Sequence, residues 1–306
     1  MPCDHMLIDA RNAAYRAIYA GLSDQNFMNA KNDFSIIFFR FIGSYLRKHE
    51  PKNVHFFWDA PKSSLWRKKL YPEYKDGREH SVKKEDFDID AALDQLTATV
   101  RELVPHLGCK SYLKDNQEAD DLIYACCRVK RNGKILIVSS DKDFQQIPHQ
   151  YSNVDCFNPM GKDNTIYQRG DNEDPVDIKC FTGEKSDNII GYYQIGPVKA
   201  TALVKDDKKR VAFLEERGWE QYLLNRALVD LSMCPYLLHN VSYIQCVLAL
   251  EQKFDITQIQ QVIQKYKVKG LQAEINNTLL PFKFLKKNEE SANGNSTRSA
   301  VDVEEN

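Results

Sequence analysis

The stretch Ile135-Leu-Ile-Val-Ser-Ser-Asp141 decides the fold, because it is a short apolar run that ends at an aspartate. Two other runs end in the same way, namely Met6-Leu7-Ile8 before Asp9 and Val54-His-Phe-Phe-Trp58 before Asp59. Continuous apolar runs between helical stretches indicate buried strands of a parallel sheet. The carboxyl ends of such strands line the crevice where ligands bind. We therefore predict an α/β fold that points three aspartates into one crevice.

The stretches between and after these runs show helical periodicity. Residues 34–46 form one amphipathic candidate, and the apolar positions between Leu93 and Val104 mark another. After about residue 180 the strand signal fades, and runs around 211–229 and 256–268 favour helices. We therefore expect helices on both faces of a sheet in residues 1–180 and a smaller helical region in 181–288. The Ser, Asn, Gly and Glu-rich end, 289–306, is predicted to be disordered.

Composition narrows the class of protein. The chain has 306 residues, 42 Lys+Arg against 43 Asp+Glu, a net charge of −1 and 42% hydrophobic residues, which is typical of a folded globular protein. No apolar run approaches the roughly 18 residues of a membrane span, and the first residues do not resemble a secretion signal. The eight cysteines include no C-x-x-C pair, so we expect reduced thiols without structural zinc. These features favour a cytoplasmic protein that does not contact a membrane, and a monomer is the default expectation.

Acidic residues form a further cluster at Glu118-Ala-Asp120-Asp121, just before a helical run. A single acid in the first turn of a helix is ordinarily a capping residue. Together with the aspartates at the strand ends, however, the cluster would crowd one crevice with carboxylates, which raise each other's pKa unless cations are present. Hard divalent cations such as Mg²⁺ are the natural counterions, and two ions about 4 Å apart are suited to in-line phosphodiester hydrolysis.

Other common chemistries have no support in the sequence. No G-x-G-x-x-G is present, and the spacing Gly191 to Gly196 is followed by Pro197-Val198 rather than the Lys-Ser/Thr of a nucleotide-binding loop. No G-x-S-x-G occurs, and the seven histidines have no partner at a catalytic spacing. The sequence thus argues against P-loop nucleotide hydrolysis and nucleophilic triads.

Two segments each leave two interpretations open. Residues 62–84 carry eight Lys/Arg against three acids, with Trp66, Tyr71 and Tyr74 interleaved. Such a segment is either a solvated charged face or a nucleic-acid-binding surface, in which rings stack on bases and cations neutralise phosphates. The segment Ile195-Gly-Pro-Val-Lys-Ala200 is either a plain turn before a helix or the hairpin of a helix-hairpin-helix that exposes backbone N–H groups to a phosphate.

Taken together, the chain resembles the flap endonuclease, or 5′-nuclease, family, and most of all its bacteriophage exonuclease and ribonuclease H members. The resemblance runs from Leu7 to at least Lys199. The matching blocks are Leu7-Ile-Asp9, Trp58-Asp59, Trp66-Arg-Lys-Lys-Leu-Tyr-Pro-Glu-Tyr-Lys-Asp-Gly-Arg78, Glu118-Ala-Asp-Asp121, Ser140-Asp-Lys-Asp-Phe144 and Gly183-Glu-Lys-Ser-Asp-Asn-Ile-Ile-Gly191.

The resemblance implies a two-metal nuclease core that uses Mg²⁺, for which Mn²⁺ can substitute. It implies a first-metal group of Asp9, Asp59, Glu118 and Asp120, with Asp120 able to bridge, and a second of Asp141, Asp143, Glu184 and Asp187, with Asp121 beside them. It also implies a helical arch at about 62–90, where Lys75 and Arg78 contact the scissile phosphate. The residues expected to bind nucleic acid are Arg67, Lys68, Lys69, Tyr74, Lys75, Arg78, Gly191, Gly196 and Lys199. Two positions depart from the family pattern, Glu184 for aspartate and Gln194 for glycine.

The function implied by the resemblance is a 5′-to-3′ nuclease that removes 5′ ends, 5′ flaps and RNA primers from duplex DNA during replication. Its substrates would be RNA–DNA hybrids and flapped or nicked duplexes, and the family implies a single-strand-binding protein and a sliding clamp as partners. If the chain is phage-encoded, its compartment is the host cytoplasm. Two alternatives stay open, a PIN-type RNA endonuclease and a junction-binding protein that does not cleave.

Overall fold

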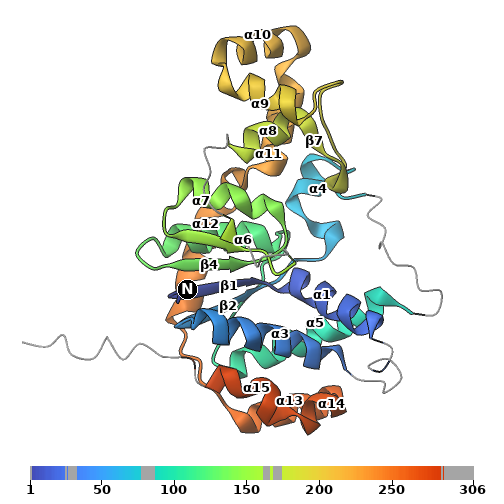
Figure 1. Ribbon diagram of the computed structural model, residues 1–306, viewed down its shortest axis with the longest axis vertical. Coiled ribbons are helices and arrows are strands. Elements are labelled where there is room, and N and C mark those ends of the chain that lie inside the picture. Colours follow the sequence, from blue (N-terminus) through green and yellow to red (C-terminus); the bar gives the residue numbers. More distant parts are fainter. Residues whose placement is uncertain are drawn as a thin grey trace, which may run out of the picture.

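The fold is known from a computed structural model that describes residues 2–24, 26, 33–76, 87–160, 166–167, 174–283 and 285. The molecule is elongated, with a sheet at its middle, a helical lobe at one end and the last helices of the described chain at the other (Figure 1). Arg78, with residues 77–86 of the expected arch, and the expected disordered tail at 289–306 lie outside the described residues. Within the described residues, no helix is long and apolar enough to cross a membrane.

The central sheet has six strands in the order β3-β2-β1-β4-β5-β6. The first five are parallel, and β6 pairs antiparallel to β5 at one edge. The apolar runs that end at aspartates form the three central strands, so the prediction of a parallel α/β sheet is confirmed. The strands are β1 (His5–Asp9), β2 (Asn53–Phe57), β3 (Lys110–Tyr112), β4 (Ile135–Val138), β5 (Val154–Phe157) and β6 (Ile166–Tyr167).

Sequence patterns did not predict β3, β5 or β6. The β3 strand is only three residues long and reads Lys-Ser-Tyr, while β5 reads Val-Asp-Cys-Phe, so neither contains a continuous apolar run. Both pair with a strand nearer the centre of the sheet. Their backbone hydrogen bonds to that neighbour, rather than local composition, make them strands.

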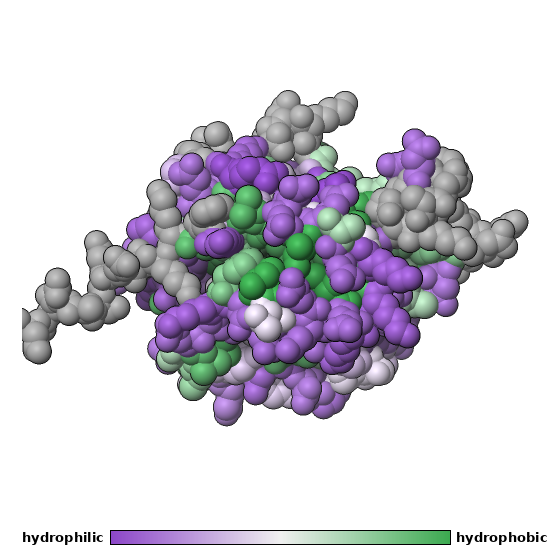
Figure 2. Space-filling view, turned by 90° about the horizontal axis from the view of Figure 1, so that it is seen from below, coloured by the Kyte–Doolittle hydropathy of each residue, from purple (hydrophilic) through white to green (hydrophobic). Residues whose placement is uncertain are grey.

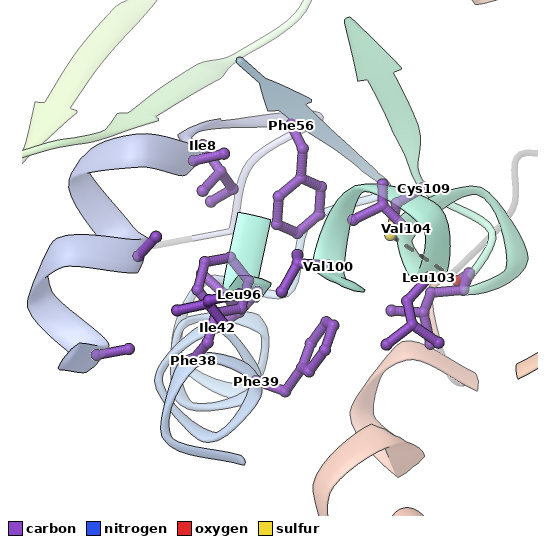
Figure 3. Packing of buried hydrophobic residues seen from close by; sticks show 14 of the residues in the cluster. Ile8, Phe38, Phe39, Ile42, Phe56, Leu96, Val100, Leu103, Val104 and Cys109 are labelled. Carbon is purple, nitrogen blue, oxygen red and sulfur yellow. Dashed lines mark hydrogen bonds between the residues drawn. The ribbon is translucent and has the colours of Figure 1, made fainter. Parts of the chain in front are cut away.

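Helices cover both faces of the sheet. The pleat sends Met6 and Ile8 toward one hydrophobic cluster and Leu7 toward the other. Figure 3 shows the first cluster, where Ile8 and Phe56 meet side chains from two helices. The first face is covered by α1 (Ala10–Ser23), α3 (Phe34–His49) and α5 (Ile89–His106), and the second by α6 (Ala119–Val129), α7 (Gln146–Gln150) and α12 (Leu237–Ala249).

A helical lobe stands beyond the layer of α6, α7 and α12, at the top of Figure 1. It consists of α8 (Pro175–Thr182), β7 (Gly183–Glu184), β8 (Ile189–Ile190), α9 (Pro197–Lys205), α10 (Asp207–Arg217) and α11 (Trp219–Val229), with the short helix η3 (Lys185–Asp187) between the two strands. Its hydrophobic cluster also contains Leu65 and Tyr74, which flank α4 (Trp66–Leu70) after η1 (Lys62–Ser64). The lobe therefore shares a core with the start of the expected arch.

The helical region is divided differently from the expected 181–288 segment. Helix α8 already belongs to the lobe, and after η4 (Leu231–Met233) the chain returns to the sheet as α12. It then ends in α13 (Ile256–Tyr266), α14 (Lys269–Ala273) and α15 (Ile275–Lys283), which pack under α3 and α5. Seen from that end, the surface is mostly hydrophilic with a hydrophobic area near its centre (Figure 2).

Candidate active site

The acids that follow the central strands lie around one cavity of about 780 Å³. Asp9 ends β1 and caps α1, where its Oδ1 accepts a 3.1 Å hydrogen bond from the Asn12 N–H. Asp59 follows β2 and accepts a 2.8 Å bond from the Ala119 N–H. Five predicted acids line this cavity, namely Asp9, Asp59, Glu118, Asp120 and Asp141.

The start of α6 is held by a capping box between Glu118 and Asp121. Asp121 is fully buried, and its Oδ2 accepts hydrogen bonds from the Glu118 N–H (3.1 Å), Trp66 Nε1 (3.0 Å) and Arg67 Nη1 (3.1 Å). Its Oδ1 accepts a further bond of 2.9 Å from Arg67 Nη2. The expectation of Asp121 as a metal ligand is therefore corrected, because both oxygens are already bonded to protein donors and the carboxylate does not reach the cavity.

Arg67 and Tyr74 also differ from their expected role as nucleic-acid contacts. Arg67 is 1% exposed, and besides Asp121 it donates a 2.8 Å bond to Glu118 Oε2. Tyr74 is 3% exposed, and its hydroxyl lies 3.2 Å from both Glu118 Oε2 and Asp187 Oδ2. Neither side chain is accessible to a nucleic acid. Both instead hydrogen-bond the carboxylates from the buried side, away from the cavity.

Lys75 reaches the cavity from the same segment. Its side chain is 15% exposed, and its ammonium pairs with Glu118 and lies 3.6 Å from Asp187 Oδ2. Lys68 is engaged locally, with Pro72 and Asp76 as partners, and Lys69 is exposed. Arg67 and Lys75 therefore both contact the acids, Arg67 from a buried position and Lys75 from the cavity.

The second group of acids is joined by a lysine that sequence analysis missed. The Lys179 ammonium on α8 pairs with both Asp143 and Glu184. Asp141 sits next to them and caps the short helix η2 (Lys142–Gln145) by accepting a 2.9 Å bond from the Asp143 N–H. Nothing in the local pattern of 175–182 signals this role for Lys179, because the contact joins elements that are far apart in the sequence.

Burial and crowding of like charges shift the titration of these acids. Burial, together with the nearby Asp59 and Asp141, raises the pKa of Asp9 to about 7. Burial and the Asp141 carboxylate raise the pKa of Asp143 to about 6, and burial and Glu118 raise the pKa values of Asp59 and Asp120. Burial also disfavours ionisation of Glu118, but Lys75 and Arg67 outweigh it and lower its pKa to about 2.

The carboxylate oxygens around the cavity are the kind of ligand that hard divalent cations prefer. Burial together with neighbouring carboxylates raises the pKa values of Asp9, Asp59 and Asp120, so that bound cations would favour their ionised forms. Among the described residues, no three His, Cys, Asp or Glu side chains already form a metal cage. Lysine ammonium groups lie among the acids instead, with Lys75 beside the first group and Lys179 within the second.

One wall of the cavity is formed by α1 side chains that sequence analysis also missed. Arg11, Tyr15 and Tyr19 line it, and the two tyrosine rings stack with centroids 6.3 Å apart. Lys62 and Lys185 line other parts of the same cavity. The spacing of Arg11, Tyr15 and Tyr19, four residues apart on one helix face, is the signal that could have revealed this wall.

The predicted nucleic-acid-binding residues between α8 and α9 differ in their surroundings. A Cβ on Gly191 would lie 2.2 Å from the Thr182 backbone, so this glycine is required for close packing and not for approach to a phosphate. Gly196, by contrast, has open space around it and caps α9, with Lys199 exposed on the first turn. Gln194, where glycine was expected, has a left-handed backbone with φ 59°.

A parallel sheet with an acid-lined cavity at its carboxyl edge defines the class of protein as an α/β protein with a carboxylate-rich active site. The family described as "5′-3′ exonuclease, N-terminal resolvase-like domain" matches residues 4–174. The flap endonuclease Xni of Shewanella baltica is 32% identical over 209 residues, which cover 65% of this chain and 73% of that protein. The corresponding protein of Shewanella putrefaciens is 30% identical over 211 residues, with the same coverage.

Solved structures show the same fold. The bacteriophage T5 D15 protein co-crystallised with metal ions has a TM-score of 0.61 at 17% identity and covers 86% of this chain and 99% of its own. A T5 5′-exonuclease structure with bound zinc has a TM-score of 0.56 at 19% identity, covering 87% and 98%. The chain belongs to the 5′-to-3′ exonuclease and flap endonuclease family, and it is a nuclease that acts as a phosphodiesterase.

Proposed function

We propose that the protein is a two-metal, Mg²⁺-dependent 5′ nuclease that removes 5′ flaps and RNA primers annealed to DNA. The observation that carries the proposal is the single cavity lined by Asp9, Asp59, Glu118, Asp120 and Asp141, in which burial and mutual repulsion raise several carboxylate pKa values. Such a cavity binds cations rather than bare phosphate. The T5 flap endonuclease, which shares the fold, has been crystallised with DNA and metal ions.

In this proposal Asp9, Asp59, Glu118 and Asp120 hold the first ion, and Asp141, Asp143, Glu184 and Asp187 hold the second. Bound divalent ions supply the positive charge and Lewis acidity that phosphodiester hydrolysis needs. Water adds to phosphorus, the bond to the 3′ oxygen breaks, and the products are a 3′ hydroxyl and a 5′ phosphate. Asp121 is left out of this metal-binding set, and Arg67 and Tyr74 are left out of the nucleic-acid contacts. These three residues position Glu118 and Asp187 instead.

The protein's own cations act on the substrate. Lys75 lies at the cavity beside Glu118, where its ammonium can meet the charge that develops on the scissile phosphate. The exposed start of α9, with Gly196 and Lys199, offers backbone N–H groups and a cation to duplex phosphates, so we propose that α8 and α9 act as a helix-hairpin-helix. Arg78 belongs to the same proposal as a phosphate contact and lies outside the described residues.

The cellular setting completes the proposal. Removal of 5′ flaps and RNA primers is a step of DNA replication, which implies a cytoplasmic protein, in the host cytoplasm if the chain is phage-encoded. A single-strand-binding protein and a sliding clamp are the proposed partners, and the protein is proposed to act as a monomer. Light scattering coupled to size exclusion checks the oligomeric state, and a mass of two chains would contradict a monomer.

The deciding experiment is cleavage of a 5′-labelled DNA flap and a 5′-labelled RNA primer, each annealed to DNA, in Mg²⁺ and in EDTA. We expect short 5′ products from both substrates in Mg²⁺ only. Asp9→Asn should abolish them, whereas Asp207→Asn, at an 81% exposed carboxylate on α10, should cleave like the wild type. Binding of the flap without cleavage in any divalent metal would contradict the proposal. Cleavage of single-stranded RNA alone would favour the PIN-type alternative.

A further inference from the structure

Helix α11 connects the hairpin between α8 and α9 to the acid cavity. Near its middle, the Asn225 side chain is 1% exposed and donates hydrogen bonds to the carbonyl oxygens of Cys180 (2.9 Å) and Ile190 (2.8 Å). These two carbonyls belong to the end of α8 and to β8, at the start of and within the segment that joins α8 to α9. A shift of the hairpin would therefore disturb its hydrogen bonds to α11.

The carboxyl end of α11, one turn after Asn225, is bonded to the acids through Arg67. The last carbonyls of a helix have no partner within the helix and need donors from elsewhere. Arg67 Nε donates 2.9 Å to the carbonyl of Leu228, while its Nη groups bind Glu118 and Asp121. One guanidinium thus joins the end of α11 to the acids that begin α6.

The second acid group is tied to the same helix end by a buried glutamine. Gln146 is 2% exposed, and its Nε2 lies 3.1 Å from the Val229 carbonyl and 2.9 Å from the Asp143 carbonyl. Its Oε1 accepts a 2.9 Å bond from the Leu231 N–H. Buried side chains therefore tie the last turn of α11 to the carboxylates of Glu118 and Asp121, through Arg67, and to the backbone of Asp143, through Gln146.

We propose that the carboxyl end of α11 couples binding of duplex DNA at the hairpin to the geometry of the metal-binding acids, with Arg67 as the positioning residue at the junction. This inference rests on the proposed function. Arginine is suited to the task because its five donors in a planar fork bind a carbonyl and two carboxylates at once, which a lysine ammonium cannot match. Coupling of this kind is reciprocal, so DNA must tighten metal binding as much as metal tightens DNA binding.

The test is a linkage measurement that does not require turnover. A fluorescent 5′-flap DNA is titrated with the full chain in EDTA and in Ca²⁺, and the ratio of the two dissociation constants is the coupling. Ca²⁺ affinity is measured by calorimetry with and without the unlabelled flap. Binding couplings between sites are typically about 5- to 150-fold, and we expect the wild type to fall in this range.

Arg67→Lys should bring this ratio close to one and leave the dissociation constant in EDTA within about twofold of the wild type. Gln146→Leu, which removes the tie to Asp143, should act in the same direction and serves as the second variant if Arg67→Lys does not fold. Asn225→Ser, which weakens the contact of α11 with α8 and β8, should also lower the ratio. Combined with Arg67→Lys it should add little, because both act through one path.

The matched control is Val262→Ala on α13, a 4% exposed core position far from the cavity. It should lower the unfolding temperature and keep the wild-type ratio. An Arg67→Lys variant that loses stability but keeps the ratio would reduce Arg67 to a purely structural role, and a wild-type ratio near one would also overturn the coupling. Failure of the wild type to cleave flap DNA in Mg²⁺ is a separate outcome, which contradicts the proposed function itself.

Discussion

The backbone N–H of Lys75 donates a 2.8 Å hydrogen bond to the carbonyl oxygen of Asp187. This bond fixes the start of the expected arch against the second acid group, and it accompanies a left-handed backbone at Lys75 with φ 58°. A non-glycine residue adopts this conformation at a cost, which surrounding contacts must offset. The Lys75 ammonium is held in the cavity as a result, beside Glu118.

Lys75→Ala should therefore lower the rate of cleavage about 10²- to 10³-fold, because it removes a preorganised charge from the transition state. Flap affinity in Ca²⁺ should change little. Single-turnover cleavage and fluorescence anisotropy measure the two quantities. Lys69→Ala, at an exposed lysine of the same segment, is the control and should cleave normally. A change in affinity alone would make Lys75 an ordinary phosphate contact.

Asp141→Ala should remove nearly all cleavage, because the substitution removes a carboxylate that lines the cavity and belongs to the proposed second metal group. DNA binding in Ca²⁺ should be largely retained, as measured by the same anisotropy titration. Full activity of this variant would remove Asp141 from the proposed second metal group.

Without metal, the half-buried Asp9 carboxylate should destabilise the fold at neutral pH. Its folded pKa of about 7 lies above the unfolded value of 3.8, so the folded state holds the proton more tightly. The unfolding free energy in EDTA should therefore fall as pH rises from about 4 to 7, by up to about 4 kcal/mol from this group. Chemical denaturation of Asp9→Asn should show higher stability than the wild type at pH 8 and equal stability at pH 3. Equal stability of the two at pH 8 would refute this account.

Gln194→Gly should stabilise the hairpin, because glycine adopts the left-handed backbone at φ 59° without the steric cost that glutamine has. The expected gain is about 0.5 to 1 kcal/mol, reduced by the greater freedom of glycine in the unfolded chain. Thermal unfolding measures it, and flap affinity in EDTA should rise or stay equal. A loss of stability would show that the Gln194 side chain has a packing role.

Substitution of alanine for two glycines of the same segment should have different effects on stability. A Cβ at Gly191 would lie 2.2 Å from the Thr182 backbone, so Gly191→Ala should unfold or displace the hairpin. A Cβ at Gly196 meets nothing within 4 Å, and Gly196→Ala should fold normally. Circular dichroism melts compare the two variants. A Gly191→Ala variant as stable as the wild type would contradict this packing.

Much of the fold and of the acid set could be predicted from local patterns. Apolar runs that end at Asp9, Asp59 and Asp141 became adjacent parallel strands, and the shared direction of these strands brought the aspartates to one edge. The α1 wall escaped prediction, because aromatic residues at helical spacing are as typical of a packed face as of a binding site. The strands β3 and β5 escaped it because their pairing, rather than their composition, makes them strands.

What the sequence determined by itself is the order of strands, helices and acids along the chain, since periodicity and residue type are local properties. Only the tertiary structure decided which charged residues face the cavity and which are buried behind it. Arg67 and Lys69 are both basic and nearly adjacent in the chain, yet one is buried against two carboxylates while the other is exposed. The physical reason is that burial and ion pairing depend on segments far apart in the chain, such as the end of α11, which supplies the carbonyl that completes the Arg67 site.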